Sequence, residues 1–477
     1  MSQIKSGLAV LEQRLSMEGI KWFILLLLAV FLFWPFYLRQ PVLGIDGQGH
    51  WAISCIFITL AAWILHPVRL PRGVAAVLMM GLLLAGNLSY SDVFYGFTTS
   101  AIWIIIPAFL FGYVISQTGL GESITLRVLN RFGGNLLKMA FALVAVGIIF
   151  SILTPSTTVR IAIVMPIVYQ VIKGLKLPAQ SPESAFITLV AYTAAIIPGN
   201  GWLTGSLIGP FNMGLLPEVL RADLDWYNYS RAMIFPWLLI AVLLLLFLFL
   251  VFRPHRFAPV KSEAGVLRQI SRQEISAAIV LSLCFLGYLT TPWHGLEAAT
   301  ITAFSLFLLF VTGTLTSQSI SNGVNWEVVL FLGAIMSVTK VLESAGITAL
   351  LGEKLYPVLM SFAGNVTLFI YCVIGLTLLL RFVDVAWGLP TVAVLFSFAP
   401  ALASVGIHPI VLCFLNGVIQ YFTFMHYMQP FAIISGNILE QRGWSDKHLA
   451  LFGIGYILSV ALSIVPAVWY WTWLGFF

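Results

Sequence analysis

Charged residues are scarce in this chain: 9% of its 477 residues are Asp, Glu, Lys or Arg, whereas 60% are hydrophobic. A soluble domain of this length has no interior large enough to hide so much apolar surface. The chain also has only four cysteines, and all lie inside apolar runs, which gives no disulfide framework and no metal-binding spacing. We therefore predict an integral membrane protein.

Several catalytic and motor motifs are also missing. The chain has no phosphate-binding Gly-Lys-Ser/Thr loop, which excludes an ATP-driven motor within it, and no His-Glu-x-x-His metalloprotease helix. Asp384 has no second intramembrane carboxylate with which to form an aspartyl-protease-like pair. The net charge of +6 comes from basic residues in short loops, so it indicates membrane topology and no nucleic-acid partner. We predict that the protein is not an enzyme and has no cofactor.

The apolar runs have the length of membrane helices. A helix needs about 20 residues to cross the hydrocarbon core, and runs such as 22–37, 51–65, 235–252 and 451–473 reach or approach that length. The first run follows an amphipathic segment and precedes no Ala-x-Ala cleavage site, so we interpret it as a retained helix. The alternating pattern of a membrane barrel is absent from the sequence, which predicts an all-α membrane protein.

The distribution of basic residues predicts the orientation. If the N-terminus is cytoplasmic, 17 of the 24 Lys and Arg residues lie in cytoplasmic segments, which is a strong positive-inside bias. We count about eleven membrane spans, an odd number that places the C-terminus outside. Three basic residues, Arg160, Lys340 and Arg381, remain in or beside the membrane.

Two long apolar stretches are interrupted by polar, helix-breaking residues, and the two interruptions lie at matching places in the halves of the chain. One is 152–160, with Thr154-Pro-Ser-Thr-Thr158, and the other is 380–390, with Asp384 and Pro390. Broken helices persist at membrane depth only where protein buries them or a wet cavity meets them. Paired breaks therefore predict a solute site in a transporter.

The spacing of these features predicts two inverted repeats. Gly119 precedes Ser156 by 37 residues, and Gly346 precedes Asp384 by 38. We expect an amphipathic N-terminus and first membrane helix over residues 1–45. The first repeat would cover 46–260 with a re-entrant hairpin near 135–173, and the second 261–477 with a hairpin near 362–404. The alternative to the first hairpin is an ordinary helix pair with a polar external loop. Small hydroxyl residues at the break favour re-entry.

The first break has the residues of an anion site. A helix that starts after Pro155 presents free amide groups and a partial positive charge, and Ser156, Thr157 and Thr158 then cap it or contact a ligand. The alternative is that these hydroxyls only cap the helix and pack against neighbours.

A second polar, glycine-rich break follows, and its exposed carbonyls suit a hard cation such as Na⁺. The alternative is an external loop. The polar and glycine residues of this break are Asn200, Gly201, Thr204, Ser206 and Asn212.

Asp384 is the most telling single residue, because a carboxylate inside an apolar run needs a partner or a task. It is a candidate for carrying a coupling proton or helping to hold Na⁺. The alternative is a fixed ion pair with Arg381, three residues earlier, or with Lys340.

The other polar groups also have two interpretations each. Arg160 and Arg381 offer positive charge to an anion, or extend to the interface or pair with acidic groups. His426 lies among Gln420, Thr423 and Gln429, where it is a ligand donor, a proton relay, or a buried hydrogen-bonded histidine.

The order of these elements resembles the divalent anion:sodium symporter family, the dicarboxylate, citrate and sulfate carriers of the ion transporter superfamily. The similar stretches span nearly the whole chain: 110–121 with Arg131-Phe-Gly-Gly134, 154–166, 203–212, Trp326-Glu-Val-Val-Leu-Phe-Leu-Gly333, His426-Tyr-Met-Gln-Pro430, and the Trp-rich end near Trp469. The family has Ser-Asn-Thr at both hairpin tips, where it helps to bind Na⁺ and faces the substrate carboxylates. Here the first tip has Ser156-Thr157-Thr158, and the second has Val383-Asp384-Val385 with no hydroxyl until Thr391.

The resemblance carries a set of expected site residues. The family's Thr-Pro substrate contacts correspond to Gly209-Pro210 and Gln429-Pro430 here. The expected substrate contacts are Ser156, Thr157, Thr158, Asn200, Thr204, Pro210, Thr391, His426, Gln429 and Pro430. The expected ion-coupling residues are Ser156, Thr158, Gly201, Ser206 and Asp384, with Na⁺ near Ser156, Thr158 and Gly201, and charge partners Arg160, Lys340 and Arg381.

We therefore predict a secondary active transporter of small anions, of the di- or tricarboxylate or sulfate class. It would work by elevator-like alternating access, either coupled to Na⁺ or H⁺ or by exchange. By the resemblance it is a homodimer in a bacterial inner membrane. The alternatives are a divergent carrier of another organic solute, with Asp384 as its proton-coupling site, or a channel.

Overall fold

The computed structural model describes residues 19–33, 45–65, 70–132, 135–253, 269–362, 364–382 and 389–477. The regular elements in these ranges are α-helices and two short 3-10 helices. This confirms the all-α fold. Asp384 lies outside the described residues.

Six helices are long and apolar enough to cross a membrane among the described residues: α8 (Leu136–Leu153), α9 (Thr157–Gly174), α10 (Pro182–Ile196) with η1 (Pro198–Gly201), α13 (Trp226–Phe252), α14 (Arg272–Leu289) and α25 (Asp446–Trp473). The number rises to eight if two bent pairs each form one span. These pairs are α6 (Ile102–Thr118) with α7 (Leu120–Phe132), bent by 63°, and α17 (Ser317–Gly323) with α18 (Trp326–Ser344), bent by 68°.

Further helices complete the fold, and the longest of them is α2 (Gly47–Leu65), with 19 residues. Five of them are apolar, which makes them further candidates toward the eleven spans predicted: Gly19–Phe33, α3 (Arg72–Ala85), α16 (Ala298–Val311), α20 (Val366–Leu380) and α23 (Ile410–Gln420). The others are α2 (Gly47–Leu65), α4 (Tyr90–Val93), α5 (Tyr95–Thr98), α11 (Ile208–Leu215), α12 (Glu218–Arg221), α15 (Thr291–His294), α19 (Ile347–Met360), α21 (Leu389–Ser397), α22 (Ala399–Ser404), η2 (His426–Met428) and α24 (Pro430–Ile438).

The two halves repeat one order of elements. In the first half α6, α7, α8, α9, α10, η1, α11 and α13 follow one another, apart from the short α12, and in the second half the order is α18, α19, α20, α21, α23, η2, α24 and α25, apart from the short α22. Gly119 ends α6 with φ 78°, and Gly346 follows α18 with φ 70°, the left-handed backbone that glycine adopts without strain. Asn135 and Asn365 cap the first hairpin helix of each half, α8 and α20.

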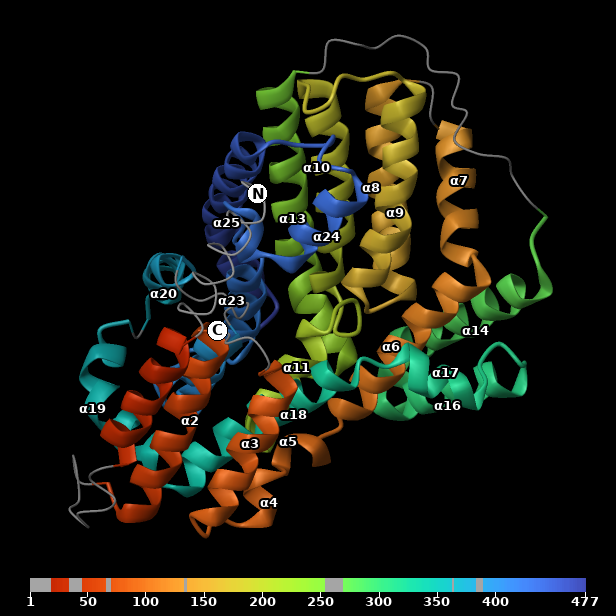
Figure 1. Ribbon diagram of the computed structural model, residues 1–477. Helices are drawn as coiled ribbons and strands as arrows, with labels where there is room; N and C mark the ends of the chain where they lie inside the picture. The colour runs from red at the N-terminus through yellow and green to blue at the C-terminus, as the bar shows by residue number, and fades with distance from the viewer. Residues whose placement is uncertain are drawn as a thin grey trace, which may run out of the picture.

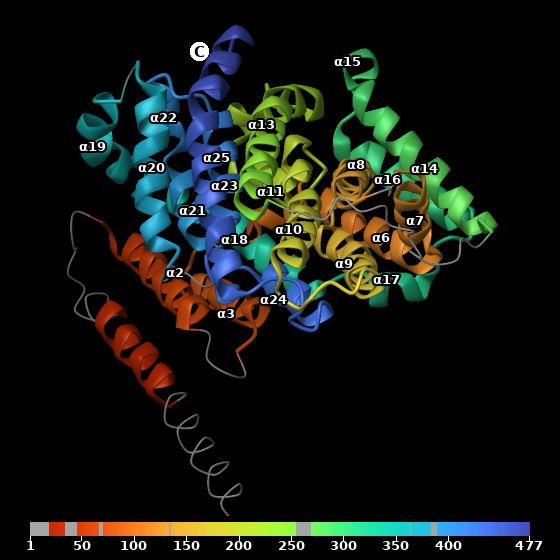
Figure 2. The same cartoon turned by 90° about the horizontal axis from the view of Figure 1, so that it is seen from above.

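Packing interleaves the two halves. The helix α10 packs against α8, α9 and α13, while α13 runs along α25, the last helix of the second half. Figure 1 shows these helices as an upright group, with α6, α14, α16, α17 and α18 lying across one end of it. Seen from above in Figure 2, α8, α9 and α10 lie on one side of α13, and α20, α23 and α25 lie on the other.

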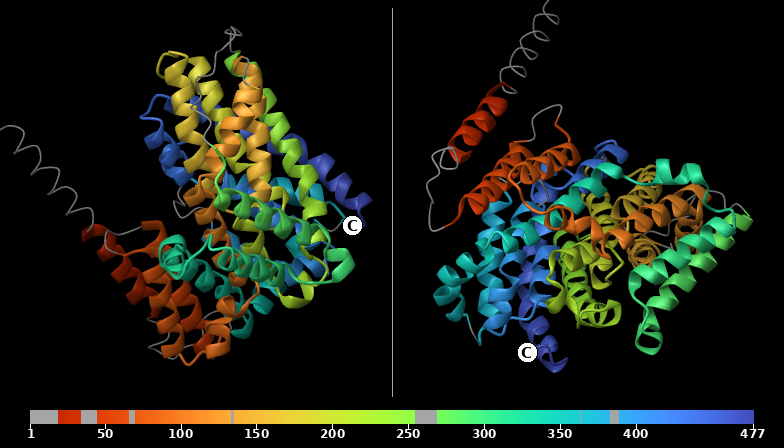
Figure 3. Two further views of the ribbon diagram at one scale, coloured as in Figure 1. Left: turned by 90° about the vertical axis from the view of Figure 1, so that its right-hand side faces the viewer. Right: turned by 90° about the horizontal axis from the view of Figure 1, so that it is seen from below.

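The helix Gly19–Phe33 lies at the edge of the molecule, beside α2 (Figure 3). Its last turn contacts α2, because Ser54 Oγ donates a hydrogen bond to Leu32 O at 2.8 Å. It therefore takes no part in the broken helices at the centre.

Candidate functional site

The first hairpin breaks where the sequence predicts. The helix α8 ends at Leu153 and α9 begins at Thr157, because Pro155 has no amide hydrogen with which to continue the helix. Ser156 caps α9, and its side chain accepts a hydrogen bond from Val159 N at 3.4 Å. Ser156 and Thr157 are both buried. The start of α9 is thus a helix N-terminus enclosed within the protein.

Arg160 lies in the first turn of α9 and is fully buried, with 0% of its surface exposed. Its Nη1 donates to Gly205 O at 2.6 Å and to Thr154 O at 3.1 Å, and its Nη2 donates to Thr157 Oγ1 at 2.9 Å. These three acceptors are neutral. Among the described residues no carboxylate lies within 4.0 Å of Arg160, and its Nε has no hydrogen-bond partner. A buried positive charge therefore lies at the hairpin tip without a counter-charge from these residues.

Two glycines of the first unwound segment allow this close approach. This segment, residues 197–207, joins α10 to α11 and contains η1. A Cβ on Gly199 would lie 2.6 Å from Arg160 Nη2 and 2.4 Å from Gly205 O. A Cβ on Gly205 would lie 2.3 Å from Gly199 O. Only glycine at these two positions lets the backbone at Gly199, the backbone at Gly205 and the guanidinium pack together.

Asn200 and Ser206 hold the same segment in shape. Asn200 Nδ2 donates to Ile196 O and Ile197 O, both at 3.2 Å, and thereby satisfies carbonyls that the end of α10 frees. Ser206 Oγ donates to Asn200 Oδ1 at 3.0 Å. The predicted polar break is therefore a buried, internally bonded segment, which argues against an external loop.

Tyr421 brings the second half of the chain to this tip. It follows α23, is buried, and its hydroxyl interacts with Thr157 and Asn200 beside Arg160. Sequence reasoning missed Tyr421, because a tyrosine at the end of an apolar helix is typical of an interfacial anchor.

Arg381 plays a related part in the second half. It follows α20 directly and is also buried. Its Nη2 donates to Met428 O at 2.6 Å, in the second unwound segment, residues 421–429, which joins α23 to α24. In each half, therefore, a buried hairpin arginine binds a carbonyl of the unwound segment that follows it.

Side-chain amides connect the two halves in what we call the amide chain, Asn212–Asn416–Gln420–Gln429. Asn416 Nδ2 donates to Asn212 Oδ1, and Gln420 Nε2 donates to Asn416 Oδ1 at 2.5 Å. Gln429 Nε2 continues the chain to Gln420 O at 2.8 Å. At its other end Asn212 Nδ2 donates to Tyr229 Oη at 3.3 Å. The four amide residues are buried, and the sequence signal for them was the i, i+4 spacing of Asn416 and Gln420.

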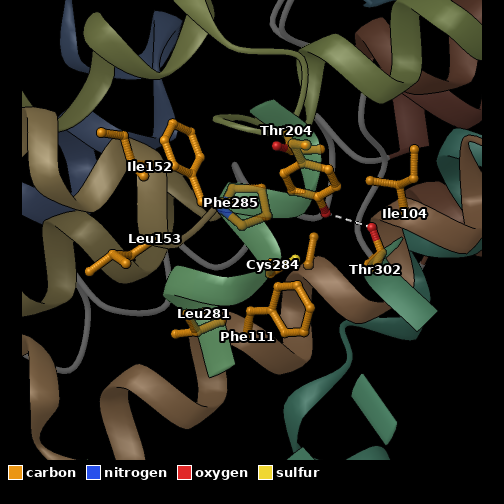
Figure 4. Close-up of a pocket in the computed structure, with 12 residues that line it drawn as sticks. Ile104, Phe111, Ile152, Leu153, Thr204, Leu281, Cys284, Phe285 and Thr302 are labelled. Carbon is orange, nitrogen blue, oxygen red and sulfur yellow. Dashed lines mark hydrogen bonds between the residues drawn. The ribbon is translucent and has the colours of Figure 1, made fainter. Parts of the chain in front are cut away.

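A small apolar cavity, of about 10 Å³, lies where the hairpin tip meets α6, α14 and α16. Figure 4 shows Ile152 and Leu153 of the first hairpin and Thr204 of the first unwound segment around it, with Phe285 and Phe111 among the facing side chains. Its polar hydroxyls have partners: Thr302 Oγ1 bonds to Tyr288 Oη at 2.6 Å, and Thr204 Oγ1 accepts from Trp226 Nε1 at 2.9 Å.

Two larger cavities flank α12. One has a volume of about 310 Å³ and includes Arg221 and Thr291 in its wall, and the other, of about 230 Å³, includes Lys340. Lys340 Nζ forms an ion pair with Glu343 Oε2 at 3.0 Å. The alternative pairing of Lys340 with Asp384 stays a prediction, since Asp384 lies outside the described residues.

His426 is held by the connection between α24 and α25. Its Nε2 accepts a hydrogen bond from Trp444 Nε1 at 3.0 Å, so the ring proton lies on Nδ1, which is 2.9 Å from Asp446 Oδ1. Both ring nitrogens are thus occupied, as expected of a histidine with a structural role. Direct contact with a solute stays a prediction.

The remaining predicted residues divide between the site and its surroundings. Thr158 is exposed, whereas the neighbouring Thr157 is buried. Gly201 is buried against Ile234, Pro210 is buried within α11, Pro430 is the first residue of α24, and Thr391 lies on α21.

Comparisons with known proteins agree with this architecture. The family model described as the transmembrane region of sodium:sulfate symporters matches residues 20–477. A putative malate transporter, YflS of Bacillus subtilis, is 25% identical over 64% of this chain and 66% of its own length. The chloroplastic dicarboxylate transporter 1 of Arabidopsis thaliana is 23% identical over 90% of this chain and 77% of its own length.

Two further comparisons concern an antiporter and a solved structure. The L-tartrate/succinate antiporter of Escherichia coli is 24% identical over 79% of this chain and 75% of its own length. The crystal structure of the Alcanivorax borkumensis YdaH transporter aligns with a TM-score of 0.57 and 16% identity, covering 90% of this chain and 98% of that one. This likeness confirms the fold.

Proposed function

The chain belongs to the sodium:sulfate symporter family of membrane transporters, and from that premise we propose that it is a secondary active carrier of small dicarboxylate anions. The family consists of transporters and not of enzymes. Relatives named for malate, dicarboxylate, and tartrate and succinate support the dicarboxylate class.

The observation that carries this proposal is the buried charge of Arg160. A guanidinium at membrane depth is costly unless a counter-charge is near, and the described residues supply none within 4.0 Å. A carboxylate that arrives at the tip supplies it. The N-terminus of α9 adds free amide groups and about half a positive charge at the same place.

The proposed contacts come from both halves. Ser156, Thr157 and Asn200 would bind one carboxylate at the first tip, with Arg160 directly behind Thr157. The second half would supply the contact to the other carboxylate through Thr391, Gln429 and the start of α24 at Pro430. Anions with two carboxylates suit a site that is made by two such elements.

Alternating access would move the hairpins relative to α6, α14 and α16. The mainly apolar side chains around the small cavity at this boundary support that motion, because apolar surfaces move past one another without loss of hydrogen bonds (Figure 4). We propose repeats over 46–260 and 261–477, a cytoplasmic N-terminus, a bacterial inner membrane and a homodimer.

Uptake into proteoliposomes tests the function. We expect saturable uptake of labelled malate, succinate or tartrate, and acceleration by the same anion inside the vesicles. Lactate, which carries a single carboxylate, should compete weakly. Arg160→Ala should abolish uptake, whereas Arg131→Ala, at an exposed position on α7, should not.

The contrary outcomes identify the alternatives. Flux that neither saturates nor shows counterflow would make the protein a channel. Proton-driven uptake of a different solute that Asp384→Asn abolishes would favour the divergent carrier.

A further inference from the structure

Sodium is the coupling ion that the family name implies. The residues of the first hairpin tip show whether this chain could bind Na⁺ there. Broken-helix transporters hold Na⁺ with backbone carbonyls of their unwound segments. Hard cations of this kind take oxygen ligands, which include carbonyl and hydroxyl oxygens. The relevant question is therefore which oxygens of the tip are available.

Arg160 already occupies the oxygens of this tip. The carbonyls of Thr154 and Gly205 and the hydroxyl of Thr157 converge on its two terminal nitrogens, at 3.1, 2.6 and 2.9 Å. Two come from the hairpin and one from the first unwound segment. This is an arrangement of oxygens suited to a cation, and it is filled by a cation that belongs to the chain.

The neighbouring oxygen atoms do not form a second Na⁺ site. Ser156 Oγ accepts from Val159 N, and Asn200 Oδ1 accepts from Ser206 Oγ. Thr158 is exposed, whereas Thr157 is buried. Gly199 packs so closely on the guanidinium that a single added Cβ would lie 2.6 Å from Nη2. The donor set therefore does not fit Na⁺ at this tip.

We infer that the guanidinium of Arg160 takes the place of a coupling cation at the first tip, so that the carrier exchanges one dicarboxylate for another without Na⁺ at this site. This inference rests on the proposed function for its substrate class. The reason for exchange is electrostatic. In a Na⁺-coupled carrier the ion dissociates together with the substrate, so the empty carrier has no excess charge at the tip. Arg160 is part of the chain and stays, so without an anion its buried charge remains uncompensated. The empty carrier therefore changes slowly between its inward-open and outward-open states, whereas the carrier with bound anion changes readily.

The first experiment is a thermal-stability measurement on purified protein in NaCl and in choline chloride. We expect the same apparent Tm for the wild type in both salts. Arg160→Ala leaves three oxygens around a vacated space, so Na⁺ should raise the Tm of this variant. Arg160→Lys, which keeps a fixed charge, and Arg131→Ala, the exposed-arginine control, should respond to Na⁺ no more than the wild type.

The second experiment is malate uptake into proteoliposomes in the same two salts. Uptake should be equal in both and at least tenfold faster into vesicles preloaded with malate than into empty ones. A wild-type Tm raised by Na⁺, or exchange that stops in choline, would overturn the inference while leaving a dicarboxylate carrier.

The two proposals fail separately. If no dicarboxylate is transported, the proposed function fails, and the Tm of the wild type in the two salts still decides whether Na⁺ binds. If Arg160→Ala does not fold, Arg160→Lys and the wild type carry the decision, because a Na⁺-dependent Tm in either contradicts a tip filled by its own cation.

Discussion

The two unwound segments of this protein solve one problem by different means. A broken helix frees backbone carbonyls that hydrocarbon cannot satisfy, and in each half a buried arginine of the hairpin binds one of them. Arg160 starts the second arm of its hairpin and binds Gly205 O, whereas Arg381 ends the first arm of its hairpin and binds Met428 O. The arginines thus approach from opposite sides of the two breaks.

The surroundings of the two arginines differ more than their roles. The first unwound segment is closed by Gly199 and Gly205, which pack against the guanidinium. The second is tied by the amide chain, which extends from Gln429 across the molecule to Asn212 on α11. The arginine of the first break is therefore enclosed by glycine backbone, whereas the second break is also tied to the first half by side-chain amides.

The largest effect should follow from filling the first segment. In Gly199→Ala the new Cβ would meet Gly205 O and both terminal nitrogens of Arg160, at 2.4 to 2.7 Å. The backbone oxygen cannot move aside as a flexible side chain can, so we expect a loss of about 3 kcal/mol in stability and at least a tenfold loss of transport. Thermal melts and proteoliposome uptake measure the two effects.

Gly375→Ala is the matched control in the hairpin of the second half. Gly375 lies within α20, and a Cβ there has no atom within 4 Å. Its melting temperature and uptake should stay at wild-type values. Equal losses in both variants would show that the first segment is no more tightly packed than the second hairpin.

Breaking the amide chain should have the next largest effect. Asn212→Leu leaves the buried Asn416 Nδ2 without its acceptor, which destabilises by about 1 to 3 kcal/mol. Adding Asn416→Leu should recover part of that loss, since removing both partners is less harmful than removing one. A double-mutant cycle on melting temperature measures the coupling between Asn212 and Asn416. Strictly additive losses would show that the two side chains do not stabilise the protein through their hydrogen bond.

Substitutions of two adjacent threonines at the tip distinguish a direct role in substrate binding from a general effect of polar side chains. Thr157→Val removes an acceptor of Arg160 and a hydroxyl that faces Tyr421, so the apparent KM for malate should rise about tenfold, as expected for about 1.5 kcal/mol. Thr158→Val, at the exposed neighbour, should change the KM less than twofold. The reverse order would support Thr158 as the ligand that the sequence predicts.

The sequence predicts the position of the first break but not the hydrogen-bond partners of the residues around it. Pro155 and Ser156 carry local signals, a missing donor and an N-cap, and these act within a few residues. The direction of Arg160 depends on Gly205, 45 residues away, and the partner of Asn212 lies 204 residues later. Such pairings follow from how the helices pack, which no local pattern encodes. For this reason the sequence alone allows two interpretations of Arg160: it offers its charge to an anion, or it extends to the interface or pairs with acidic groups.

The smallest effect should come from Lys340, a partly exposed cation of the second half. Its side chain is 36% exposed and forms an ion pair with Glu343, an i, i+3 neighbour, and pairs of this kind contribute about 0.5 kcal/mol or less. Lys340→Met should therefore melt within a degree or two of wild type and transport normally. Glu343→Gln, which breaks the same pair from its other side, should do the same.

A different result for Lys340 would change the comparison between the halves. If Lys340→Met loses transport tenfold while Glu343→Gln does not, then Lys340 acts on something other than Glu343. The charge partner predicted for it is Asp384. The second half would then also have a cation that acts in transport, and the assignment of recognition to the first half alone would no longer hold.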